Sequence, residues 1–192
     1  MRTAIPDWLP TGVLPLINPS APTMPDRSPY SVSLTDLVLR FNTSEERKAI
    51  LEGFLNFREA LHGLGVIAGF QWLDGSFLED IESTESRCPR DLDVVTFFHL
   101  PAPETQRSLL QKSPPLFSPK QTKQKFNVDA YFVVLDVRNA EPLVEQSTYW
   151  YSMWSHRRSG EWKGYLQIDL DSTEDAAARA NLVNPTGPGG NP

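Results

Sequence analysis

The sequence has few of the features that would assign a protein to the cell exterior or to a membrane. Cys88 is the only cysteine among the 192 residues, which excludes an internal disulfide framework and a zinc site made of cysteines, and which favours a reducing compartment. No segment approaches the ~18 consecutive apolar residues of a membrane span, and residues 1–6 lack the apolar core of a signal peptide. We therefore expect a soluble, cytoplasmic protein with no membrane partner.

Positive charge is also scarce. The chain has 18 Lys and Arg residues against 24 Asp and Glu residues, which gives a net charge of −6. Such a balance argues against a broad surface that follows the phosphates of duplex DNA, although local basic clusters are compatible with it.

Proline is abundant at one end of the chain. Seven of the 17 prolines fall within residues 1–30, where they block helices and central strands. Apolar residues such as Trp8 and Leu14 lie between them, more than a disordered leader would carry. We expect residues 1–30 to form an extended arm packed on the domain, residues 31–170 to form that domain, and residues 171–192 to form a short helix and a frayed tail.

Helical and strand patterns alternate along the domain. Thr43 and Glu46 have the spacing of a capping box and predict a helix that ends near Gly63. Further segments predict strands over 68–73, 92–100, 127–137 and 163–170, and helices over about 104–112, after Pro119, over 141–156 and after Asp171. This order predicts an α/β (α+β) fold with a mixed β-sheet of four or five strands flanked by helices.

Two acidic residues lie close together at the start of the second predicted strand. Asp91 and Asp93 are two positions apart, so their side chains point to the same face and repel each other unless a cation lies between them. Mg²⁺, which prefers oxygen ligands, is the obvious candidate. The preceding strand leads into Gly75 and Ser76, which let a backbone turn approach a phosphate and add a hydroxyl there. The alternative is a solvated strand start, which the apolar run over 94–98 disfavours.

The order of helix, strand, Gly-Ser turn and Asp-x-Asp strand resembles that of the minimal nucleotidyltransferase superfamily, which has the polymerase-beta-like fold. In that superfamily an apolar strand ends in Gly-Ser or Gly-Gly, Asp-x-Asp follows on the next strand, and a later strand supplies a third carboxylate. Gly75 and Ser76 match the turn, and Asp91 and Asp93 match the pair. Asp129 is the best match for the third carboxylate.

Asp136 on the same segment competes with Asp129, which we prefer because it precedes an apolar stretch as Asp93 does. The chain is also similar to an uncharacterised bacterial nucleotidyltransferase-like branch, through its proline-rich start with Ile5-Pro6 and its late Lys163-Gly164. The loop between Ser76 and Asp91 is unusually long and acidic for the superfamily.

The resemblance implies a two-metal site in which Asp91, Asp93 and Asp129 hold Mg²⁺ or Mn²⁺ and perform catalysis, while Gly75, Ser76 and Lys163 bind the nucleotide. The implied reaction transfers NMP from an NTP to a hydroxyl of a protein or of an RNA such as a tRNA end, in a toxin–antitoxin or phage-defence pair. Arg157, Arg158 and the lysines at 120–125 are alternative cations for the triphosphate.

A second interpretation is a non-catalytic nucleotidyltransferase fold that serves as a binding module, either an antitoxin or a subunit of a complex. The aromatic residues Tyr149, Trp150, Tyr151 and Trp154 would then contribute to an interaction surface, although core packing is the simpler interpretation. A platform for stacking a nucleobase is the other alternative for this cluster.

Overall fold

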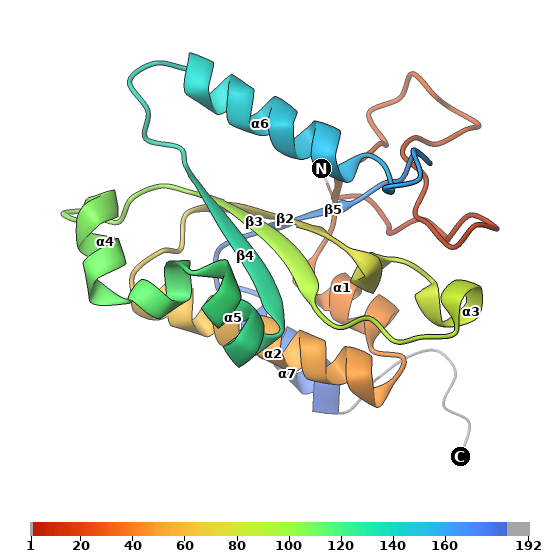
Figure 1. Ribbon diagram of the computed structural model, residues 1–192, viewed down its shortest axis with the longest axis horizontal. Coiled ribbons are helices and arrows are strands. Elements are labelled where there is room, and N and C mark those ends of the chain that lie inside the picture. The colour runs from red at the N-terminus through yellow and green to blue at the C-terminus, as the bar shows by residue number, and fades with distance from the viewer. Residues whose placement is uncertain (1, 184–192) are drawn as a thin grey trace.

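A five-stranded mixed sheet lies at the centre of the computed structural model, which describes residues 2–183 (Figure 1). Its strands are β1 (Tyr30–Ser31), β2 (Gly69–Asp74), β3 (Leu92–Phe98), β4 (Val128–Val134) and β5 (Leu166–Asp169). Their order across the sheet is β1-β5-β2-β3-β4. β2 is antiparallel to β3 and β5, whereas the β3/β4 and β1/β5 pairs are parallel. The predicted α+β class with a mixed sheet is confirmed.

Helices lie on both sides of this sheet. Those in the described part of the chain are α1 (Leu34–Phe41), α2 (Glu45–Gly63), α3 (Ile81–Glu85), α4 (Gln106–Lys112), α5 (Pro119–Phe126), α6 (Glu141–Trp154) and α7 (Asp175–Val183), with short 3₁₀ turns η1 (Ser76–Leu78) and η2 (Pro114–Phe117). In Figure 1, α1, α2, α5 and α7 lie on one side of the sheet and α6 on the other. No helix among residues 2–183 is long and apolar enough to cross a membrane.

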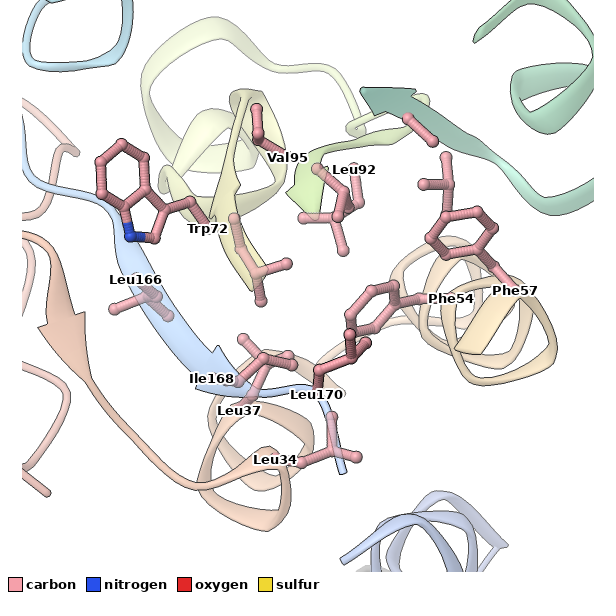
Figure 2. Packing of buried hydrophobic residues seen from close by; sticks show 14 of the residues in the cluster. Leu34, Leu37, Phe54, Phe57, Trp72, Leu92, Val95, Leu166, Ile168 and Leu170 are labelled. Atoms are coloured by element: carbon pink, nitrogen blue, oxygen red, sulfur yellow. The ribbon is translucent and has the colours of Figure 1, made fainter. Parts of the chain in front are cut away.

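The core forms where α1 and α2 pack on the sheet. Figure 2 shows Phe54 and Phe57 of α2 turned toward Leu92 of β3, with Leu37 of α1 close to Ile168 of β5. All five side chains are buried. Burial of each such side chain stabilises the fold by about 1.5–3 kcal/mol, so this layer contributes strongly to holding β3 in place.

The capping box predicted for α2, with Thr43 as N-cap and Glu46 at its third position, is wrong. Ser44, rather than Thr43, is the N-cap, and its hydroxyl accepts a hydrogen bond from the N–H of Arg47 (3.2 Å). The N–H of Thr43 instead donates to the carbonyl of Phe41 (2.9 Å) in the turn after α1. Thr43 and Ser44 are both good N-cap residues, but only Thr43 has a Glu three positions later. The turn after α1 engages Thr43, so Ser44 caps the helix without a capping box.

The proline-rich segment lies against the sheet. The N–H of Thr3 donates to Ser31 O (2.7 Å) beside β1, and the N–H of Gly164 donates to Leu14 O (2.7 Å). Trp8 donates its indole N–H to Leu78 O (2.7 Å). The division into arm, domain and tail stays a prediction, and the predicted frayed end, residues 185–192, lies outside the described residues.

The strand predicted over 163–170 is shorter than expected. β5 begins at Leu166, because this residue is the first to pair with β2, opposite Leu73. The N–H of Lys163 instead donates to Ser155 O (2.8 Å), and that of Gly164 donates to the arm. Lys163 therefore lies on a connecting segment between α6 and β5.

We expect Gly53→Ala to destabilise the protein, because a Cβ at this position of α2 would lie 2.0 Å from the carbonyl oxygen of Phe126 at the end of α5. Separating the two helices should cost about 1–3 kcal/mol of the free energy of unfolding, measured by urea denaturation. Gly63→Ala is the matched control, since nothing lies within 4 Å of its Cβ position. Equal unfolding midpoints for the two variants would contradict this close approach.

Candidate active site

Three aspartates lie in one row across three neighbouring strands of the sheet. Asp74, the last residue of β2, pairs with Asp93 of β3, and Asp93 pairs with Asp129 of β4. Residues opposite each other on neighbouring strands point to the same face. Asp91 precedes β3 by one residue and shares the face of Asp93. The strand register therefore brings together Asp91, Asp93 and Asp129, and adds Asp74, which the sequence motif does not include.

The carboxylate of Asp93 has unfavourable surroundings for a negative charge. Burial, together with the charges of Asp91 and Asp129, raises its pKa to about 6 from 3.8, although Lys123 and Lys163 partly offset the rise. A carboxyl group between two like charges attracts a cation strongly. Asp93 is therefore the electrostatic centre of the site.

Asp74 is more deeply buried and has its own partner. Burial raises its pKa to about 7, despite the opposing effect of Lys163. The Lys163 ammonium forms an ion pair with Asp74 Oδ1 (2.9 Å) and donates a hydrogen bond to Glu79 Oε1 (3.1 Å). Burial alone would lower the pKa of Lys163, but these two carboxylates outweigh it and raise that pKa. Lys163 is thus held charged beside the aspartates.

The turn after β2 fits closely against Asp93. Gly75 has a φ of +90°, and a Cβ there would lie 2.5 Å from Asp93 Oδ2. Only glycine provides both the backbone conformation and the space for this carboxylate. Ser76 begins η1 directly after the turn. The predicted Gly-Ser turn therefore lies against the predicted aspartate pair.

A polar cleft of about 710 Å³ opens beside this turn. Asp74, Gly75, Ser76, Asp93 and Lys163 line it on one side, and the segment after α6, with His156, Arg157 and Arg158, lines it on another. Its volume falls within the range of about 300–1,000 Å³ usual for small-molecule sites. Four of the six residues predicted for the site line the cleft; Asp91 and Asp129 lie next to it through Asp93.

Glu79 joins Arg157 and Lys163, which together form the cationic wall of the cleft. Its Oε2 accepts hydrogen bonds from Arg157 Nε (2.9 Å) and Nη2 (2.7 Å), while its Oε1 accepts from Lys163. Arg157 also pairs with Glu161 (3.0 Å). Sequence reasoning missed Glu79 because it lies in an acidic loop that looks solvated, and no local pattern marks its partners 78 and 84 residues away.

Lys123 supplies positive charge on the other side of Asp93. From α5 its ammonium forms an ion pair with Asp91, and it lies 3.6 Å from Asp129 Oδ2. Among the lysines at 120–125 considered as cations, this is the one that contacts the aspartates. Asp136, the competing third carboxylate, lies after the end of β4, where it accepts from Leu100 N (2.6 Å) and contacts His99.

The aromatic cluster of α6 divides into two kinds of residue. Trp150 and Trp154 are buried, as core packing requires, whereas Tyr149 and Tyr151 are exposed. Trp154 also borders the cleft.

The donor set fits a cation that prefers oxygen ligands, since Asp91, Asp93 and Asp129 offer only carboxylate oxygens. No group of three or more His, Cys, Asp or Glu side chains within residues 2–183 is already arranged to hold a metal ion. Between Asp91 and Asp129 the positive charge comes from the ammonium of Lys123. The chemistry of the donors thus suits Mg²⁺ or Mn²⁺, and the Lys123 ammonium lies where such a cation would contact Asp91 and Asp129.

We expect Asp93→Asn to stabilise the metal-free protein at pH 8. A carboxyl whose pKa is raised to about 6 in the folded protein contributes stability that is fully present below pH ~4. This stability is lost as the pH rises through about 6. An asparagine removes this loss, which should add about 1–3 kcal/mol to the free energy of unfolding at pH 8 and nothing near pH 4, measured by urea denaturation in EDTA. Asp7→Asn, at a fully exposed side chain, is the control. An Asp93→Asn protein that is less stable than wild type at pH 8 would overturn this account.

Comparison with known proteins adds a family but no activity. No curated protein and no solved structure matches the chain. The model of a family described as "Family of unknown function (DUF6932)" matches residues 6–169, from the proline-rich segment to the end of β5. The match includes every residue of the site described above. The chain therefore belongs to the DUF6932 family of unknown function.

Proposed function

We propose that this protein is a metal-dependent nucleotidyltransferase that transfers NMP from an NTP to a hydroxyl of a protein or an RNA in the cytoplasm. The observation that carries the proposal is the alignment of Asp74, Asp93 and Asp129 in one row across β2, β3 and β4. Gly75 closes against the central aspartate, beside a cleft with a cationic wall. A row of carboxylates, of which Asp74 is buried and Asp93 and Asp129 are partly buried, is costly to the fold, and binding of a cationic ligand is a reason to have it.

The residues have separate tasks in this reaction. Asp91, Asp93 and Asp129 would hold Mg²⁺ or Mn²⁺, which neutralises the charge of the transferred phosphate and positions it. Gly75 and Ser76 would bind the terminal phosphates through backbone N–H groups and the hydroxyl. The acceptor oxygen forms a bond to the α-phosphorus as the bond to pyrophosphate breaks. The proton of the acceptor hydroxyl would pass to the carboxylate of Asp129, whose side chain is 22% exposed and therefore open to the acceptor.

Lys163 has a different environment from the one expected of a free phosphate-binding lysine. It lies on the cleft, but Asp74 and Glu79 already share its charge. The nucleotide would therefore meet Lys163 and Arg157 as a fixed pair joined through Glu79. A preorganised pair costs less to order when the triphosphate binds than two free side chains would.

The charge of the chain favours some acceptors over others. A net charge of −6 argues against a broad surface for long nucleic acids. A protein partner or a small structured RNA end, such as that of a tRNA, fits better. A toxin–antitoxin or phage-defence pair would supply such an acceptor close to the enzyme.

The test is incubation of the protein with each α-labelled NTP, Mg²⁺ or Mn²⁺, and a lysate that contains proteins and RNA. We expect label transfer to fall by about 10²-fold or more in Asp93→Ala and Asp129→Ala, because each loses a carboxylate that holds the cation. Digestion of the labelled product with protease or ribonuclease then identifies the class of acceptor.

Asp136→Ala is the matched control, since Asp136 lies on the same segment as Asp129 but contacts His99 and Leu100 instead of the aspartates. It should keep wild-type transfer. Absence of transfer with every NTP and both metals would reject the proposal, and equal losses in the Asp129 and Asp136 variants would reject the assignment of Asp129.

A binding module is the second candidate, and one observation favours it. Lys123 and Lys163 already pair with Asp91, Asp129, Asp74 and Glu79, so part of the negative charge of the site is compensated without any ligand. If the protein is such a module, the wild-type protein and Asp93→Ala should capture a partner from the lysate equally well. Neither protein should transfer label.

A further inference from the structure

We propose that Lys123 is a built-in counter-ion of the site: its ammonium occupies the position of a cation between Asp91 and Asp129 and must leave before a divalent ion binds there. The inference rests on the proposed function only in taking these aspartates as ligands of a divalent cation. It makes Lys123 a residue that sets how strongly the protein binds metal.

Backbone hydrogen bonds hold the main chain of Lys123 next to the start of β3. α5 ends at Phe126, and Asn127 then takes a left-handed conformation with a φ of 55° that turns the chain directly into β4 (Figure 1). The N–H of Asn127 donates to Lys123 O (3.1 Å), and Asn127 O accepts from the N–H of Leu92 (3.0 Å). This pair of hydrogen bonds ties the last turn of α5 to the start of β3, between Asp91 and Asp93.

The Lys123 ammonium interacts electrostatically with the same carboxylates that would hold a divalent cation. The hydrogen bond to Asp91 is the main cause that raises the pKa of Lys123, and the charges of Asp91, Asp129 and Asp93 add to it. In turn, Lys123 opposes the rise in the pKa of Asp93. One ammonium thus interacts with all three predicted metal ligands.

The same ammonium is placed so that it can be displaced. The side chain of Lys123 is 51% exposed, whereas that of Lys163 is 8% exposed and held between two buried carboxylates. A half-exposed lysine can turn its charge into water at little cost, because its long flexible stem reaches solvent in several rotamers. A divalent ion carries twice the charge and binds carboxylate oxygens directly, so it can compete successfully.

The test measures Mn²⁺ binding to the nucleotide-free protein by loss of the free-ion EPR signal. We expect Lys123→Met to bind Mn²⁺ about tenfold more tightly than wild type, because no ammonium then competes for Asp91 and Asp129. Melting in EDTA provides a second readout. Lys123→Met should unfold at a lower temperature than wild type in EDTA, and Mn²⁺ should raise its melting temperature more than it raises that of wild type.

Lys112→Met is the matched control, since Lys112 is also about half exposed and ion-paired with a carboxylate, that of Glu104. It removes the same charge away from the aspartates and should leave Mn²⁺ affinity within about twofold of wild type. If Lys123→Met does not fold, Lys123→Gln replaces it. Unchanged or weaker Mn²⁺ binding in the Lys123 variant, or an equal gain in the Lys112 control, would overturn the proposal.

The result is separable from the fate of the proposed function. No Mn²⁺ binding by any of the proteins would also overturn the role of Lys123. The transfer reaction would still be decided by the labelled NTP experiment, in which the metal arrives with the nucleotide. Tighter binding in Lys123→Met without any label transfer would keep the counter-ion and reject the enzyme.

Discussion

Repulsion among carboxylates at one end of the sheet is the constraint on which the rest of the site depends. The register of β2, β3 and β4 places Asp74, Asp93 and Asp129 in one row across the three strands, and Asp91 adds a fourth negative charge. Their burial is unfavourable unless positive charge compensates it, as the raised pKa values of Asp74 and Asp93 show. Lys163 and Lys123 provide that compensation from opposite sides. The first is buried and fixed, and the second is half exposed and able to move.

The fixed side of the site is connected to the core through the buried Arg47. Arg47 of α2 donates to the carbonyls of Phe77 (2.6 Å) and Glu79 (2.7 Å) and pairs with Glu82, which holds the loop after β2 in place. That loop presents the Glu79 side chain to Arg157 and Lys163. The hydrophobic layer that positions α2 therefore also positions the cationic wall of the cleft. Arg58, about three helical turns further along α2, pairs with Asp175 of α7.

Much of the fold could be predicted because its signals are local. The helical spacing of α2 and the apolar runs of β2, β3 and β4 identify those elements from neighbouring residues only. The errors lie at boundaries, where two local patterns compete or where a distant segment decides. Ser44 replaces Thr43 as the cap because of the turn after α1, and β5 begins at Leu166 because Gly164 pairs with the proline-rich segment. A single sequence contains no record of either contact.

The candidate site divides in the same way. The sequence alone determined that Asp91 and Asp93 share a face and that a Gly75-Ser76 turn precedes them, because the alternation of a strand and the freedom of glycine are properties of adjacent residues. The parallel pairing of β3 with β4 decided that Asp129, rather than Asp136, joins the pair. Only the tertiary structure could add Glu79 and Asp74 to the site and single out Lys123 among the lysines at 120–125. Their partners lie far along the chain, and electrostatic pairing depends on distance in space, which a sequence pattern does not contain.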